Sequence, residues 1–202
     1  PVSESIEWGK EVRMGKLDGK IYRSAAVDLA GDGKLDLFVA AEKGDHLYRW
    51  NTDKKTMDDV TAASGLKATS EYFVWGDFNG DGRIDLASFD GKALAHFTQD
   101  EKGAFTGKPV NTGDALQDGC FGLTTFDSGD PAQKGRPVIL VSTKAAPIAL
   151  TIQSDGSAAA KPITTEKVGG PDMGAPAECL LADFDNDGIP DAIQLFSQQS
   201  LY

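Results

Sequence analysis

The feature that most constrains this chain is a nine-residue acidic motif that recurs along it. Residues 77–85 read D-F-N-G-D-G-R-I-D, and residues 183–191 read D-F-D-N-D-G-I-P-D. Both segments fit the pattern D-x-[DN]-x-D-G-x-x-D. Residues 28–36, D-L-A-G-D-G-K-L-D, keep every motif position except the third, which is Ala30. A motif that returns in this way indicates a repeat protein in which each copy marks one structural unit.

The spacing of the copies predicts a further, degenerate one. The three motifs begin at residues 28, 77 and 183, so the intervals are 49 and 106 residues, and half of the second interval is 53. A copy is therefore expected near residues 127–130. A weak match is found there, with Thr125 at the first motif position, Asp127 at the third, and an insertion over residues 131–134. We expect this copy to have lost its metal.

Short apolar runs flank the motifs and predict strands rather than helices. Around the second motif they cover residues 72–75 and 84–89, and further runs follow the first two motifs at 46–50, 56–60, 93–98 and near Phe105. Runs of four to eight residues bounded by Gly and Asp are typical of buried β-strands. Four such strands in about 50 residues indicate one blade of a β-propeller.

The fold class predicted from this pattern is all-β, a β-propeller of four-stranded blades with a calcium-binding loop between the first and second strands of each blade. About three and a half blades are expected, in a single partial domain over residues 1–202. The blades are expected at residues 21–66, 67–113, 114–168 and 169–202, the last being incomplete. Because a blade leaves unpaired edges unless neighbours close the ring, we expect a fragment of a ring of six to eight blades. A closed four-bladed ring is the alternative.

The motif places oxygen ligands at a spacing that suits calcium. Side chains at positions 1, 3 and 5 point to one side of a tight loop, Gly at position 6 permits the turn, and the carboxylate at position 9 completes the coordination. Hairpin turns rich in Asp and Gly would explain a single copy, but a turn does not need four side-chain oxygens in register. The candidate ligands are Asp77, Asn79, Asp81, Arg83 and Asp85 in one loop, Asp183, Asp185, Asp187, Ile189 and Asp191 in another, and Asp28, Asp32, Lys34 and Asp36 in the first, with Arg83, Ile189 and Lys34 contributing backbone carbonyls. We expect two strong Ca²⁺ sites and a weaker one in the first loop, where Ala30 offers no ligand.

The charge of the chain agrees with bound cations and argues against a nucleic-acid partner. Asp and Glu number 31 against 20 Lys and Arg, which gives a formal net charge of −11. Such a chain repels a phosphate backbone, whereas three Ca²⁺ ions would add six charges and leave −5. No apolar stretch approaches the length of about 20 residues that a membrane span needs. Cys120 and Cys179 are expected as free buried thiols, with a disulfide between them as the alternative.

The first unit resembles a known repeat family. Residues 25–40 carry the first motif with its flanking strands, and residues 59–66, D-V-T-A-A-S-G-L, end the unit. These segments resemble the FG-GAP or VCBS repeat of integrin-type β-propellers, strongly in the first two units, moderately in the last and poorly in the third. The resemblance implies a ring that is most often seven-bladed, calcium in the loops on one face, and an extracellular or periplasmic location.

No catalytic constellation accompanies the repeat. His46 and His96 stand apart from any Cys or second His, and no nucleophile elbow, phosphate-binding loop or dinucleotide motif is present. We expect aromatic residues such as Trp50 to pack between blades, with stacking on sugar rings as the alternative, and we expect Trp75 in the core. We therefore expect a non-enzymatic, calcium-binding, secreted or periplasmic module for protein or glycan partners, as in cell adhesion or a larger assembly. The alternatives are a non-catalytic part of a calcium-dependent polysaccharide-processing enzyme and a scaffold subunit of a large periplasmic complex.

Overall fold

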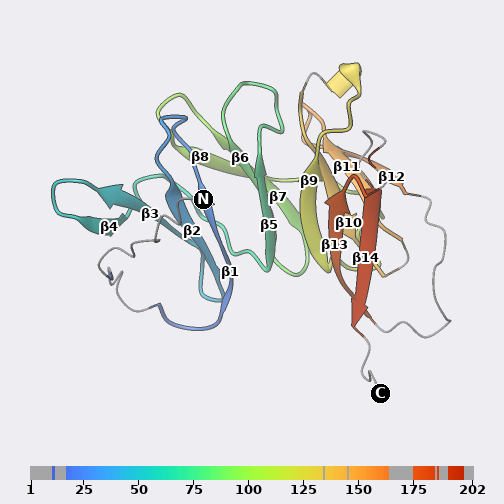
Figure 1. Cartoon of the computed structure of the whole chain (residues 1–202), viewed down its shortest axis with the longest axis horizontal. Helices are drawn as coiled ribbons and strands as arrows, with labels where there is room; N and C mark the ends of the chain where they lie inside the picture. Colours follow the sequence, from blue (N-terminus) through green and yellow to red (C-terminus); the bar gives the residue numbers. More distant parts are fainter. Residues whose placement is uncertain are drawn as a thin grey trace, which may run out of the picture.

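The strands of the chain form antiparallel sheets in sequence order (Figure 1). The structure is a computed structural model. It describes residues 11, 17–133, 135–144, 146–163, 175–184, 186 and 191–197, which are called the described residues below. The first sheet contains β1 (Ile21–Val27), β2 (Asp36–Ala41), β3 (His46–Asn51) and β4 (Thr56–Asp59). The second contains β5 (Tyr72–Gly76), β6 (Asp85–Phe89), β7 (Leu94–Gln99) and β8 (Phe105–Pro109). The third contains β9 (Gly122–Phe126), β10 (Val138–Ser142), β11 (Ile148–Ile152) and β12 (Ala158–Pro162), and the last pairs β13 (Ala175–Ala182) with β14 (Asp191–Ser197).

Each four-stranded sheet is a meander in which every strand pairs with the next one in the chain. In the second sheet, Trp75 of β5 lies opposite Leu86 of β6, and Leu86 lies opposite Phe97 of β7. Among the described residues the helical structure is one 3₁₀ turn, η1 (Pro131–Gln133), which falls within the insertion expected in the degenerate copy. The all-β prediction is therefore confirmed, with three four-stranded sheets.

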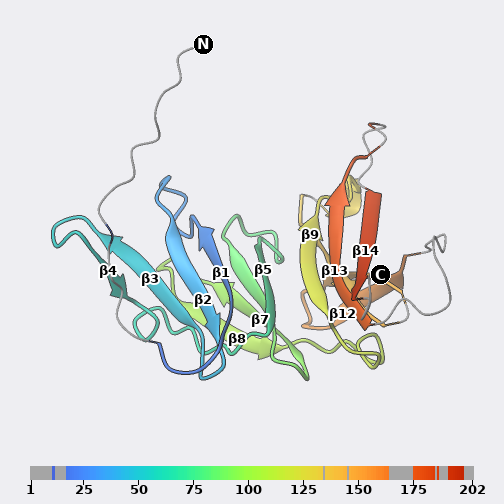
Figure 2. The same cartoon turned by 60° about the horizontal axis from the view of Figure 1, so that its bottom comes forward.

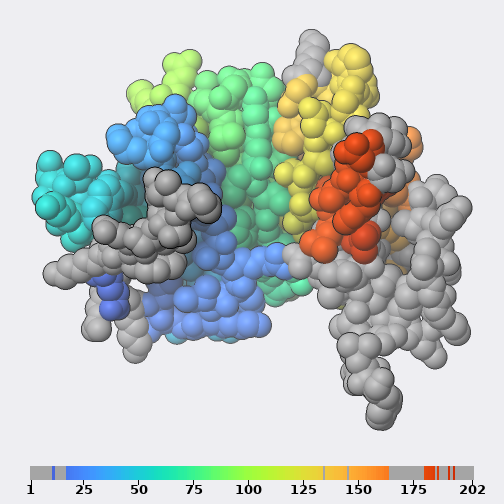
Figure 3. All heavy atoms as spheres, in the orientation of Figure 1, coloured from blue at the N-terminus to red at the C-terminus, as the bar shows by residue number. Residues whose placement is uncertain are grey.

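The sheets stand side by side through their first strands. β1 contacts β5, β5 contacts β9, and β9 contacts β13, so the first strands form one row. Figure 2 shows the remaining strands of each sheet extending away from this row, and the space-filling view shows the blue, green and yellow sheets following one another along the molecule (Figure 3). Propeller blades stack in this way, with the first strand of each blade nearest the axis.

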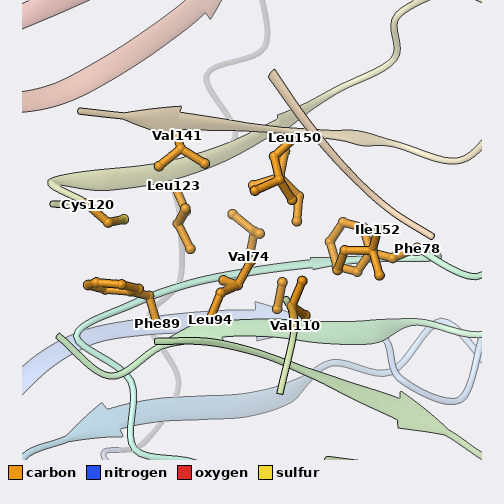
Figure 4. Packing of buried hydrophobic residues seen from close by; sticks show 12 residues of the cluster. Val74, Phe78, Phe89, Leu94, Val110, Cys120, Leu123, Val141, Leu150 and Ile152 are labelled. Atoms are coloured by element: carbon orange, nitrogen blue, oxygen red, sulfur yellow. The ribbon is translucent and has the colours of Figure 1, made fainter. Parts of the chain in front are cut away.

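Apolar side chains fill the spaces between neighbouring sheets. Leu86 of β6 belongs to a cluster shared with Phe38 and Leu47 of the first sheet. Its neighbour Ala87 belongs to a second cluster, shared with Leu150 of the third sheet and shown in Figure 4. Both faces of β6 are thus buried, which explains why its sequence D-L-A-S-F shows no alternation of polar and apolar residues. Each sheet depends on its neighbours for most of its core.

The segment D-V-T-A-A-S-G-L connects the first sheet to the second through hydrogen bonds. The hydroxyl of Thr61 accepts the backbone N–H of Leu47 at 2.8 Å, and the carbonyl of Ser64 accepts the backbone N–H of Phe105 at 2.7 Å. Gly65 follows with φ of +70°, a conformation that side-chain-bearing residues rarely adopt. This segment therefore ends one sheet and fixes the fourth strand of the next.

Candidate metal centre

The acidic loops all connect the first strand of a sheet to its second strand. They run between β1 and β2, between β5 and β6, and between β13 and β14, and the degenerate copy runs between β9 and β10. In the first three sheets these loops lie along the upper edge of the molecule in Figure 1. We call this side of the molecule the motif edge. The repeat therefore places its acidic side chains along one edge of the stacked sheets.

The loop between β5 and β6 is organised around the carboxylate of Asp77. Oδ1 accepts the backbone N–H groups of Gly80 at 2.7 Å and Asp81 at 3.0 Å, and Oδ2 accepts that of Gly82 at 2.7 Å. Gly80 and Gly82 have φ of +79° and +84°, so glycine allows the chain to turn sharply around the carboxylate. The first motif position thus fixes the loop by accepting three backbone donors.

The second and third side chains of this loop contact each other. Asn79 accepts the backbone N–H of Asp81 through Oδ1 at 2.8 Å and donates from Nδ2 to Asp81 Oδ2 at 3.0 Å. Asp81 also forms an ion pair with Arg83, whose Nε donates to the carbonyl of Gln99 at 2.9 Å. The structure therefore brings Asp77, Asn79 and Asp81 together, with the Arg83 guanidinium beside them.

Asp85, at the ninth motif position, has different partners. Its side chain is fully buried, and Oδ2 lies 2.9 Å from Nε2 of His96 while Oδ1 accepts the backbone N–H of Gln99 at 3.0 Å. Both partners belong to β7, so the carboxylate joins β6 to β7 in this structure. The structure does not bring Asp85 into contact with the three loop side chains, and its role as a calcium ligand stays a prediction.

The loop between β1 and β2 repeats this arrangement with fewer side-chain contacts. Asp28 accepts the backbone N–H groups of Asp32 at 3.1 Å and Gly33 at 2.7 Å. The side chain and backbone N–H of Lys34 hold the pKa of Asp32 below its usual range. Asp36, the counterpart of Asp85, is buried and accepts two hydrogen bonds from Arg49 of β3, at 2.9 and 2.7 Å.

The remaining copies are described in part. In the last loop Asp191 accepts the backbone N–H of Phe184 at 2.9 Å, so its ninth-position carboxylate faces its own loop. Asp183 is exposed, whereas the expected ligands Asp185, Asp187 and Ile189 lie outside the described residues. In the degenerate copy Asp127 accepts the backbone N–H of Gly129 at 2.9 Å.

The side-chain oxygens of Asp77, Asn79 and Asp81 are chemically suited to a hard cation. Two carboxylates and one amide oxygen are the ligand types that Ca²⁺ prefers. Within the described ranges, no group of three or more His, Cys, Asp and Glu side chains is arranged so that it could hold a metal ion. Asn79 is not among these residue types, and Asp85 is bound to β7. The expected Ca²⁺ sites therefore stay predictions.

Two clefts at the motif edge were not anticipated from the sequence. One, of about 470 Å³, lies between the first and second sheets and is lined by Ala30, Arg49 and Arg83. The other, of about 170 Å³, lies between the second and third sheets and is lined by Asn79, His96 and Arg136. Arg83 of the second loop and Arg136 of the degenerate copy each contribute to one of these clefts. The sequence signal for them was a basic residue near the end of each of these two loops.

The stacked four-stranded meanders with a repeated loop at one edge define a β-propeller. A solved structure of a lectin from Agrocybe aegerita, described as recognising non-reducing terminal N-acetylglucosamine, matches this chain with a TM-score of 0.55. The two are 18% identical, and the match covers 85% of this chain and 46% of the lectin chain. At this identity the likeness shows the fold. The chain spans about half the length of that structure.

A known repeat model matches part of the chain. Residues 28–88 match the family model described as FG-GAP-like repeat, in agreement with the resemblance of the first unit. The matched segment begins at the first acidic loop, includes the second, and ends within β6. No curated protein matches the chain. Within the described residues, no helix is long and apolar enough to cross a membrane.

Proposed function

We propose that this chain is a calcium-stabilised β-propeller module that binds a glycan or protein partner outside the cytoplasm. The observation that carries the proposal is the alignment of the acidic loops along one edge, beside clefts that lie between the sheets. The FG-GAP-like repeat at residues 28–88 and the likeness in fold to a lectin support a role in binding. The proposed activity is recognition rather than catalysis.

In this proposal calcium has a structural role at the motif edge. Asp77, Asn79 and Asp81 would hold the ion in the second loop, and Asp28 and Asp32 would hold a weaker one in the first. Bound calcium supplies positive charge that offsets the repulsion between carboxylates held close together. The loops would then keep a fixed shape beside the clefts, which prepares the motif edge for a partner.

The partner is proposed to bind at the motif edge. The cleft between the first and second sheets is lined by both cationic and anionic side chains, among them Arg49, Arg83 and Asp100. Mixed polar groups around a concave surface provide hydrogen bonds for sugar hydroxyls or for polar side chains of a protein. A polar, concave cleft favours a binding module, because a scaffold subunit is expected to use a broad apolar interface instead.

The calcium part of the proposal is tested by thermal unfolding with calcium and with a chelator. Calcium should raise the melting temperature of the chain, and Asp81→Ala should reduce that rise. Asp53→Ala is a matched control, because Asp53 is exposed and lies outside the motifs, and it should keep the full rise. An equal rise in all three proteins would refute calcium binding at this loop.

The binding part is tested separately, by immobilising the chain and probing it with an array of purified glycans in calcium. Binding of at least one glycan above the level of the heat-unfolded chain would support a glycan partner. If no glycan binds, a protein partner at the motif edge becomes the hypothesis to test next.

A further inference from the structure

A small cleft over the first acidic loop has the composition of a sugar-binding site. We call it the loop-1 cleft, and its volume is about 160 Å³. The residues that matter here are Ala30, Asp32, Lys34, Leu35, Arg49 and Trp50. We propose that the loop-1 cleft binds one saccharide ring, with Trp50 as the stacking surface. This inference rests on the proposed binding function and names a ligand class and a site for it.

The apolar part of the cleft is an exposed aromatic and aliphatic pair. Trp50 of β3 is 39% exposed and Leu35 is 59% exposed, whereas most large apolar side chains of the first two sheets are buried. Exposed apolar side chains that lie together and are surrounded by polar groups mark binding surfaces, whereas single exposed apolar side chains are common on any protein surface. An indole face suits the C–H face of a sugar ring, because both are flat and weakly polar.

The polar part of the cleft is fixed in place by hydrogen bonds. Arg49 donates from Nε and one terminal nitrogen to the two carboxylate oxygens of Asp36, at 2.9 and 2.7 Å. This pair uses two of the five N–H donors of a guanidinium. Lys34 pairs with Asp32 at 3.1 Å on the same cleft. Neighbouring donors and acceptors of this kind match the hydroxyl groups of a sugar, and a fixed guanidinium loses little entropy on binding.

The residue at which the first motif departs from the pattern, Ala30, lines the loop-1 cleft. Ala30 stands where the second loop has Asn79, whose side chain bonds to Asp81. Ala30 and Arg49 also line the larger cleft between the first and second sheets, so the two clefts adjoin at these residues. A chain of sugars bound at the loop-1 cleft would therefore have a path toward the second sheet.

The second sheet does not reproduce this surface. Tyr48 lies opposite Leu37 and Phe97 lies opposite Leu86, so the strand position of Trp50 corresponds to Gln99 in the second sheet. Gln99 is buried, with 5% exposure, and gives no aromatic surface. The stacking platform is thus a property of the first sheet rather than of the repeat.

The experiment follows the indole N–H signals of the three tryptophans by NMR in ¹⁵N-tryptophan-labelled chain. The Trp50 signal is assigned from the Trp50→Phe variant. The probes are the methyl β-glycosides of glucose, galactose and N-acetylglucosamine, titrated to millimolar concentrations. We expect at least one glycoside to shift the Trp50 signal saturably while the signal of the half-buried Trp75 stays in place. A Trp50 signal unmoved by all three glycosides would overturn the proposal.

Variants then separate stacking from a general loss of structure. Trp50→Ala should weaken binding about tenfold or more, and Trp50→Phe should weaken it less, because a smaller aromatic face remains. Phe184→Ala removes another exposed aromatic side chain, far along the sequence, and should leave the affinity unchanged. If Trp50→Ala binds as tightly as the wild-type chain, the sugar site lies elsewhere: the loop-1 cleft is then excluded while the proposed binding function stands. Loss of the calcium effect with sugar binding intact would instead affect only the calcium proposal.

Discussion

The carboxylate of Asp45 accepts a hydrogen bond from the hydroxyl of Ser70 at 2.5 Å and thereby joins the turn after β2 to the segment before β5. The hydroxyl of Ser70 lies 2.6 Å from that of Ser88 in β6. The other carboxylate oxygen accepts the backbone N–H groups of Ala41 and Ser70. All three side chains of this network are buried, so it links the first sheet to the second across their interface.

This network predicts a sharp difference between two substitutions. Asp45→Ala leaves two buried N–H donors without an acceptor, at a cost of about 1–3 kcal/mol for each donor. Asp45→Asn keeps an acceptor oxygen for those donors, and its amide N–H₂ can donate to the Ser70 hydroxyl. We expect urea unfolding to show a large loss of stability for the alanine variant and a small change for asparagine. Equal losses in the two variants would contradict the hydrogen-bond account.

The same residue predicts an effect of pH. Burial raises the pKa of Asp45 above its ordinary value of 3.8. The folded chain therefore holds this proton more tightly than the unfolded chain, so the contribution of Asp45 to stability falls as pH rises from 3.8 through the raised pKa. The free energy of unfolding of Asp45→Asn relative to wild type should accordingly increase between about pH 4 and about pH 7. A difference that stays constant over this range would show that folding does not change the pKa of Asp45.

Restoring the missing ligand in the first loop should strengthen its response to calcium. Ala30→Asp supplies a carboxylate at the third motif position, and about 1 kcal/mol of added calcium stabilisation corresponds to roughly 2–4 °C in melting temperature for a chain of this size. With a chelator present, the variant should melt no higher than wild type, because the new carboxylate is repelled by Asp28 and Asp32. Ala30→Ser is the control for a change of side-chain size without added charge. An unchanged calcium response in Ala30→Asp would argue against a metal at this loop.

Packing inside the second sheet predicts a clash at Gly107. A Cβ atom added to Gly107 of β8 would lie inside contact distance of the Phe97 ring, which is part of the core between the first two sheets. Gly107→Ala should therefore cost about 1–3 kcal/mol through overpacking. In a Phe97→Leu background the same change should cost less, because the smaller side chain leaves room. Additive losses in this double-mutant cycle would place the cause elsewhere.

Cys120 is expected to be unreactive in the folded chain. The thiol is free and buried, and burial raises its pKa to about 12, so its reactive thiolate form is scarce near neutral pH. Mass spectrometry after iodoacetamide treatment should find the Cys120 peptide labelled in urea and unlabelled in native buffer. Rapid labelling of the native chain would show that this part of the core opens readily.

Local pattern was sufficient for most of the secondary structure. The runs at 46–50 and 93–98 lie within one residue of β3 and β7, because apolar runs and their Gly and Asp boundaries are local properties of the chain. Trp75 was predicted in the core and packs against Phe38 and Phe105. Trp50 was expected to pack between blades, but it is 39% exposed beside the first loop, because its exposure depends on tertiary contacts rather than on local sequence.

The partners of the motif carboxylates required the tertiary structure. Asp77 binds donors three to five residues away, a range that the motif itself encodes. Asp36 and Asp85 instead bind Arg49 and His96, residues of a neighbouring strand that the motif does not include. A pattern of acidic residues therefore predicts the loop but not the direction in which its last carboxylate points.

The sequence by itself determined the repeat, the strands and the positions of the acidic loops, because hydrophobic runs, glycines and motif spacing act over a few residues. The tertiary structure alone decided which side chains meet across the sheets. Asp45 reaches Ser70 over 25 residues of chain, and Trp50 and Ala30 meet at one cleft from different loops and strands. These contacts depend on how the sheets stack, which is set by the sum of many weak packing interactions and by no single motif.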